Sequence, residues 1–171
     1  EAIVDNLSSQ YCIDQDRLYG IGYSLGSMFT YEIACQLNHR FAAVASFAGT
    51  MPVDPETCEL VGGMGVLHIH GKLDYIIDYD DDWDWKDGEH EGVGTMSNVP
   101  GMIEAWSMRA NCGSSDTDAD FFLEHITHSD CFGGARVEHY GIEFWEHTWP
   151  DEVDGTPTYQ LMWDFLSDFT N

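Results

Sequence analysis

Short apolar runs alternate with amphipathic stretches along most of this chain, and that alternation restricts its fold more than any other feature. The runs at 17–22, 41–47 and 66–69 have the length of strands, and glycine ends the first and follows the other two closely. Residues 25–38 carry apolar side chains at helical spacing between the first two runs. Strands that alternate with helices predict an α/β fold with a mostly parallel sheet flanked by helices.

Further helices are predicted at 2–10, after Ser97 and at the end of the chain. Ser97 is a plausible N-cap for a helix that ends near residues 111–113, and Thr156 is a plausible N-cap for the last helix, with Pro157 at its first position.

The stretches at 121–127 and 135–144 are expected to be extended, and 114–120 to be polar and exposed. A length of 171 residues suits one domain, so 1–171 is expected to be a single catalytic domain with an acidic insertion loop at about 78–91.

Charge excludes several classes of partner. Six Lys and Arg stand against 31 Asp and Glu, a net charge of −25. A chain this acidic cannot neutralise several phosphates, so neither nucleic acid nor an anionic membrane surface is expected as a partner. No run approaches the roughly 18 apolar residues that a membrane span needs.

The pentapeptide Gly22-Tyr23-Ser24-Leu25-Gly26 has the form G-x-S-x-G and lies between a predicted strand and a predicted helix. That context is typical of a nucleophile elbow, a strained turn that exposes a serine hydroxyl. The flanking glycines would avoid clashes where backbone segments come close. The Leu25 N–H, at the start of the helix, would then be one donor of an oxyanion hole.

A serine nucleophile needs a base, and the base needs an orienting acid. Asp74 comes soon after the predicted strand in the stretch VLHIHG, and His147 comes after the last predicted strand. The order Ser24, Asp74, His147 is the one that this architecture requires.

These segments resemble a known family. LYGIGYSLGSMFTYEIACQLNHRFAAVASFAGT, LHIHGKLDYIIDYD and EHTWP are similar to the secreted α/β-hydrolases that include polyhydroxybutyrate depolymerases, feruloyl esterases and acetyl xylan esterases. The resemblance runs from about residue 12 to the end of the chain. It implies that Ser24 is the nucleophile, Asp74 the orienting acid and His147 the general base. Tyr23 and Trp149 are expected to contact substrate, and Trp149, which flanks His147, could instead hold it by packing.

The resemblance also concerns the cysteines. Cys112 and Cys131 match positions that are often bridged in such proteins, and Cys35 and Cys58 could form a second pair, although the sequence does not fix that connectivity. Five cysteines fit an oxidising compartment, so secretion is expected.

Only 23 residues precede Ser24, whereas members of the family carry several strands there, with the loop that supplies the second oxyanion donor. The chain is therefore expected to be the C-terminal part of a larger enzyme that lacks the N-terminal strands, to be weak or inactive alone, and to have lost an upstream partner of Cys12.

Other polar clusters are expected to be structural. His68 and His70 alternate along one strand without a third ligand at suitable spacing, so one is expected to face the sheet packing and the other the strand end, and no metal site is expected. Three further histidines are expected to be exposed: His125, His128 and His139.

Asp78, Asp80 and Asp82 alternate as in a calcium loop, but Trp83 replaces the glycine that such a loop needs, so a solvated insertion is favoured. Trp83 and Trp85 could form a platform for an aromatic acyl group or a sugar ring, or pack on residues outside this chain.

The sequence thus predicts a serine esterase that needs no cofactor and acts on a neutral ester polymer or a small ester. Two alternatives stay open: a serine peptidase on the same fold, and a catalytically silent fragment that binds carbohydrate or a partner through its tryptophans.

Overall fold

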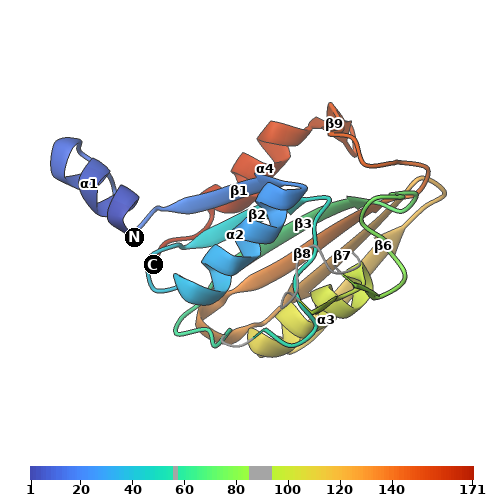
Figure 1. Ribbon diagram of the computed structural model, residues 1–171. Coiled ribbons are helices and arrows are strands. Elements are labelled where there is room, and N and C mark those ends of the chain that lie inside the picture. Colours follow the sequence, from blue (N-terminus) through green and yellow to red (C-terminus); the bar gives the residue numbers. More distant parts are fainter. Residues whose placement is uncertain (56–57, 85–93) are drawn as a thin grey trace.

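The computed structural model describes residues 1–55, 58–84 and 94–171, which are built around a six-stranded sheet (Figure 1). In spatial order its strands are β1 (Tyr19–Tyr23), β2 (Ala43–Phe47), β3 (Gly65–Gly71), β8 (Arg136–Ile142), β7 (Leu123–Ser129) and β6 (Ser114–Ala119). The first four are parallel, and antiparallel pairing adds β7 and β6. The expected mostly parallel α/β sheet is confirmed.

Helices cover both faces of the sheet (Figure 1). α2 (Leu25–Gln36) and α3 (Val99–Arg109) pack on one face, and α4 (Thr158–Ser167) packs on the other. Trp106 of α3 and Leu166 of α4 are fully buried in the two separate apolar clusters that result. α1 (Ala2–Gln10) buries none of its residues and projects away from the sheet in Figure 1.

The central strands β2 and β3 are buried along their whole length, because helices cover both of their faces. Small side chains such as Ala43 and Ala45 in β2 let those helices approach closely. At the far edge the opposite holds, since every residue of β6 is exposed. The predicted exposure of 114–120 is confirmed, and the structure adds that this polar segment forms a strand by pairing with β7.

Two predicted helix starts are wrong. The N-cap of α3 is Asn98, not Ser97, and its side chain accepts a hydrogen bond from the Gly101 N–H at 2.7 Å. Thr156 and Pro157 form the short strand β10 (Thr156–Pro157), which pairs with β9 (Glu152–Val153), so α4 begins only at Thr158. In the second case a local hairpin, with Asp154 and Gly155 at positive φ in its turn, overrides the capping signal.

The acidic insertion is described only in part. β4 (Trp83–Asp84) pairs with β5 (Thr95–Met96), while residues 85–93, with Trp85 among them, lie outside the described residues. Asp78 accepts hydrogen bonds from two following backbone N–H groups, and Asp82 accepts two from Asn98. Both carboxylates therefore organise this loop.

Two disulfides fasten the periphery of the fold. One joins Cys35 at the end of α2 to Cys58, and the other joins Cys112 after α3 to Cys131 before β8. Cys12 is a free, exposed thiol. Within the described ranges, no helix combines the length and the apolar character that crossing a membrane would require.

Candidate active site

Ser24 stands at the turn between β1 and α2 in a conformation that non-glycine residues rarely adopt. Its backbone has φ 55° and ψ −121°, and its N–H donates to the Phe47 carbonyl of β2 at 2.9 Å. Such a sparsely populated conformation persists only where the surrounding structure imposes it, and it is concentrated at functional sites. The strand and the helix therefore hold this serine in a strained turn.

One of the two glycines of the motif is required by close backbone approach, and the other is not. A Cβ at Gly22 would lie 2.1 Å from the carbonyl oxygen of Gly26, whereas a Cβ at Gly26 would meet nothing within 4 Å. The expectation that both glycines relieve crowding is therefore correct for Gly22 and wrong for Gly26. Gly49, after β2, is a second tight position, since its Cβ would lie 2.7 Å from the Ser24 carbonyl oxygen.

Asp74 follows β3 and is buried. Its Oδ1 accepts hydrogen bonds from the backbone N–H groups of Ile76 and Ile77, both at 2.9 Å. Its Oδ2 lies 2.6 Å from Nδ1 of His147 and 3.2 Å from Nε2 of His70. The carboxylate thus accepts hydrogen bonds from three groups, and the N–H of His70, which also bonds to the Ile77 carbonyl, lies close to its Oδ2.

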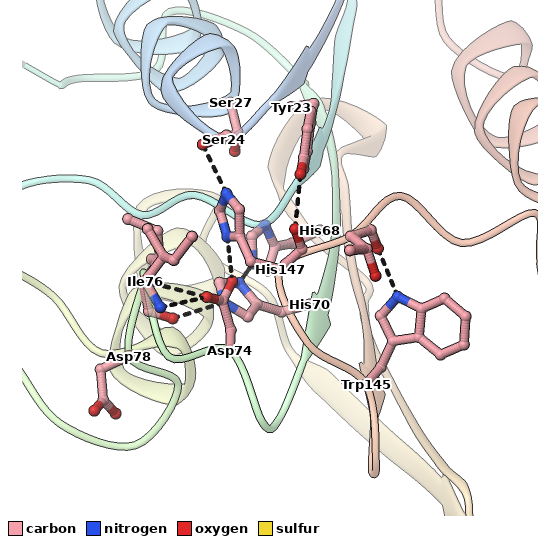
Figure 2. A network of polar contacts seen from close by, with 12 residues as sticks. Tyr23, Ser24, Ser27, His68, His70, Asp74, Ile76, Asp78, Trp145 and His147 are labelled. Carbon is pink, nitrogen blue, oxygen red and sulfur yellow. Dashed lines mark hydrogen bonds and ion pairs between the residues drawn. The ribbon is translucent and has the colours of Figure 1, made fainter.

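His147 links the other two side chains (Figure 2). Its Nε2 lies 2.8 Å from Ser24 Oγ, and its Nδ1 faces Asp74. An ionised carboxylate only accepts hydrogen bonds, so Nδ1 carries the proton and Nε2 is free to accept from the serine hydroxyl. The structure therefore brings Ser24, His147 and Asp74, separated by 123 and 73 positions, into one hydrogen-bonded series.

The electrostatics favour an ionised Asp74. Burial alone would raise the pKa of Asp74, but hydrogen bonds from His70, the Ile77 N–H, His147 and the Ile76 N–H outweigh it and hold the pKa below its usual value. The acid is therefore charged at neutral pH and can fix the orientation of the His147 ring.

Leu25 is the first residue of α2, so its N–H lies at the end of the helix where intrahelical acceptors are lacking. The helix dipole adds partial positive charge at the same place. The oxyanion of a tetrahedral intermediate bonded to Ser24 Oγ would be stabilised by both.

Tyr23 and Trp149, the expected substrate contacts, both lie beside His147. The Tyr23 hydroxyl donates to the His147 carbonyl at 2.8 Å, and its ring centroid is 5.4 Å from that of His147. Trp149 packs edge-on against Tyr23 and Phe47, at 6.1 and 5.5 Å. Both side chains are partly exposed, at 40% and 39%, so they hold the loop of His147 and still offer surface to a ligand.

Three expectations for the other histidines are wrong. His68 and His70 lie on the same side of β3, both fully buried, because residues two apart on a strand point to one face. His139 is buried as well and bonds to the Tyr79 hydroxyl at 2.8 Å, and His128 is 8% exposed. Only His125 is partly accessible, stacked on Tyr140 at 4.0 Å.

Sequence reasoning missed His70 as a partner of Asp74. The signal was present, since His70 stands four positions before Asp74, but the turn that folds the aspartate back under the strand is set by tertiary contacts. In the described part of the chain, no three His, Cys, Asp or Glu side chains are arranged to hold a metal ion.

Comparisons with known proteins agree with this fold. Residues 1–83 match the family described as phospholipase/carboxylesterase. The chain is 25% identical over 175 residues to the bifunctional acetylxylan esterase/xylanase XynS20E of Neocallimastix patriciarum, covering 98% of this chain and 22% of that protein. It is 30% identical over 162 residues to the esterase NocK of Nocardia uniformis subsp. tsuyamanensis, covering 87% of this chain and 47% of that protein.

Feruloyl esterase B of Piromyces equi is 23% identical over 174 residues, which cover 98% of this chain and 30% of that protein. The chain thus spans less than half the length of these relatives. Among solved structures, an acetyl xylan esterase from Aspergillus awamori superposes with a TM-score of 0.65 at 14% identity, over 97% of this chain and 66% of the other. The chain therefore shares the α/β-hydrolase fold of that structure, and its sequence is similar to proteins named as esterases.

Proposed function

We propose that this chain is a serine esterase that hydrolyses carboxylic esters through an acyl-enzyme, with Ser24 as nucleophile, His147 as general base and Asp74 as orienting acid. The observation that carries the proposal is the continuous hydrogen-bonded series from Ser24 Oγ to the Asp74 carboxylate, with the serine in a strained turn at a helix N-terminus. Geometry and role together identify such a triad, rather than sequence position.

In the first half-reaction Ser24 Oγ attacks the ester carbonyl carbon while His147 Nε2 takes the hydroxyl proton. The negative charge on the tetrahedral intermediate develops near the Leu25 N–H. Collapse of the intermediate breaks the bond to the alcohol, which leaves with the proton from His147 Nε2, and an acyl-serine remains.

In the second half-reaction His147 takes a proton from water as that water attacks the acyl carbon. The acid product leaves and Ser24 regains its proton. Throughout, Asp74 stays ionised and stabilises the imidazolium that forms twice in each cycle.

The substrate class that we propose is a neutral acylated polysaccharide of plant origin. Relatives named as acetylxylan and feruloyl esterases support it. The net charge of −25 supports it also, since an anionic polymer would be repelled. Polyhydroxybutyrate is the alternative that the sequence resemblance alone suggests. Two disulfides fit an oxidising compartment, so we also propose that the protein is secreted.

A fluorophosphonate probe tests the mechanism on the full chain. Covalent labelling of wild-type protein and its loss in Ser24→Ala, located by peptide mass spectrometry, are expected. Turnover of p-nitrophenyl acetate by the intact enzyme is expected to fall by roughly 10⁶-fold in Ser24→Ala, or to the detection limit. A folded wild-type chain that takes up no label would contradict the proposal, as would a variant that keeps a rate within tenfold of the parent.

The same protein distinguishes the substrates. Acetylated xylan, methyl ferulate, polyhydroxybutyrate and a peptide amide can be compared at equal enzyme concentration. Release of acetate or ferulate from the first two supports the proposed class. Cleavage of the peptide amide alone indicates a peptidase, and glycan binding without labelling indicates a silent binding module.

A further inference from the structure

A row of two buried imidazoles, those of His68 and His70, leads to Asp74 (Figure 2). His68 and His70 are fully buried on β3. His70 Nε2 lies 3.2 Å from Asp74 Oδ2 and 3.1 Å from the Ile77 carbonyl oxygen. Both of these oxygens can only accept hydrogen bonds, so Nε2 of His70 must carry a proton.

That proton fixes the roles of the groups that follow. When Nε2 holds the one proton of the His70 ring, Nδ1 is unprotonated and accepts from His68 Nε2 at 3.0 Å. His68 is left with an unprotonated Nδ1, to which the hydroxyl of Tyr31 donates at 2.6 Å. Ser46 Oγ is a second, longer neighbour of the same nitrogen, at 3.3 Å. Every donor in the series therefore points towards Asp74.

We infer that Tyr31, His68 and His70 form a one-directional hydrogen-bond relay in which His70 is a positioning residue for Asp74. The inference rests on the proposed esterase function. It goes beyond the triad, because it assigns a role to three buried polar side chains from α2 and β3 whose hydrogen bonds are to one another, to Ser46, to Ile77 and to Asp74.

The surroundings keep the first two groups of the relay, Tyr31 and His68, uncharged. Burial, together with the neighbouring His70 and His139, lowers the pKa of His68 well below its usual value. Burial also raises the pKa of Tyr31, so its hydroxyl keeps its proton. Besides the relay itself, the titratable groups packed around His70 and Asp74 come from β3, β8 and the loops that follow them: Lys72, Tyr79, His139 and His147.

A relay with a fixed direction affects both the charge and the orientation of Asp74. The His70 N–H, which lies between the Ile77 carbonyl and Asp74 Oδ2, is one of the two side-chain N–H groups at the carboxylate, and among the groups that favour its charged form it contributes most. Without it, Oδ2 would keep only His147, and the carboxylate could tilt out of the plane in which it orients the imidazole. The relay thus holds both the charge and the orientation of the acid.

Two substitutions of His70 separate its donor from its acceptor. In His70→Gln the amide Nε2 takes the place of the donating ring nitrogen. In His70→Asn the amide oxygen takes the place of the accepting Nδ1, so the bond from His68 is kept and the donor to Asp74 is lost. His139→Asn is the matched control, since this buried imidazole on the neighbouring strand bonds to the His68 carbonyl and to Tyr79 rather than to Asp74.

The readout that does not depend on turnover is the titration of Asp74, followed by the ¹³C shift of its carboxyl carbon and assigned with Asp74→Asn. In His70→Asn the midpoint is expected to move up by about one pH unit or more, because a donor to the charged form is removed. In His70→Gln and His139→Asn it is expected to stay close to wild type. The rate of fluorophosphonate labelling at pH 7 is expected to fall about tenfold in His70→Asn. In His70→Gln it is expected to fall by about threefold at most.

The possible outcomes distinguish the hydrogen-bond relay from the proposed esterase function. An Asp74 midpoint that is the same in His70→Asn and wild type overturns the relay, whether or not the protein is an esterase. Equal loss in His70→Asn, His70→Gln and His139→Asn also overturns it, since that pattern indicates general damage to the core. Failure of wild type to label, with a shifted midpoint in His70→Asn alone, overturns the esterase and leaves the hydrogen-bond relay standing.

Discussion

The Leu73 N–H donates a hydrogen bond to the Trp145 carbonyl at 2.9 Å, which fastens the turn that carries Asp74 to the loop that carries His147. Gly71 makes this contact possible, since a Cβ there would lie 2.3 Å from the Trp145 oxygen and 2.8 Å from that of Glu146. Two members of the proposed triad are therefore held together by backbone contacts as well as by their own hydrogen bond.

Gly71→Ala is expected to separate these two loops. A displacement of about 1 Å between acid and base costs on the order of a hundredfold in rate, so kcat/KM for an ester substrate is expected to fall by about that factor. Gly62→Ala is the control, because a Cβ at Gly62 meets nothing within 4 Å. Equal kcat/KM in the two variants would show that the loops adjust without cost.

The elbow glycines are expected to differ in their effect on stability. Gly22→Ala places a methyl group 2.1 Å from a backbone oxygen and is expected to lower the free energy of unfolding by about 1–3 kcal/mol. Gly26→Ala adds a methyl group to open space in a helix and is expected to be neutral or to stabilise by up to about 1 kcal/mol. Urea denaturation measures both, and a Gly26→Ala variant as unstable as Gly22→Ala would contradict the prediction.

Tyr23→Phe distinguishes support of the His147 loop from contact with substrate. Loss of the hydroxyl removes one hydrogen bond to the His147 carbonyl and is expected to lower kcat about fivefold with little change in KM. Steady-state kinetics on an ester substrate make the comparison. A rise in KM with kcat unchanged would show instead that the hydroxyl binds the substrate.

The Cys112–Cys131 bridge joins residues 19 positions apart. Its removal in the double variant Cys112→Ala/Cys131→Ala is expected to lower the free energy of unfolding by roughly 3 kcal/mol on the loop-entropy account. Cys12→Ser, which changes a free and exposed thiol, is expected to have no effect. Denaturation without reductant tests this, and a double variant as stable as Cys12→Ser would contradict it.

Buried neutral histidines make the fold sensitive to acid. Burial, with His70 as the next contribution, lowers the pKa of His139 to about 3, so the unfolded chain binds a proton there as pH falls below about 6.5 and the folded chain does not. The unfolded state then holds more protons, and the free energy of unfolding falls by up to about 1.4 kcal/mol per pH unit for this group between these values.

Comparison with His139→Asn isolates that contribution, because relief of the −25 net charge in acid acts on both proteins alike. Unfolding free energies measured from pH 7 to pH 4 are expected to decline less steeply for the variant. Parallel curves for the two proteins would show that His139 takes up its proton in the folded state as readily as in the unfolded chain.

The strand–helix alternation was sufficient to predict the parallel sheet, because buried strands and amphipathic helices leave their periodicity in the sequence. The position of Ser24, Asp74 and His147 after three parallel strands, β1, β3 and β8, was sufficient to predict that they meet, since the carboxyl ends of parallel strands share one edge. Each strand, helix and motif is carried by a short stretch of the sequence, so the residue types within that stretch specify it.

What only the tertiary structure decided is which segments pair and which polar side chains they enclose. Segment 114–119 is a strand because β7 lies beside it, and Thr156 joins a strand pair rather than capping a helix. His70 donates to Asp74, and His139 is buried, because a turn and a neighbouring strand enclose these polar rings. Burial and hydrogen-bond direction are properties of the assembled core, and no single segment of the sequence contains them.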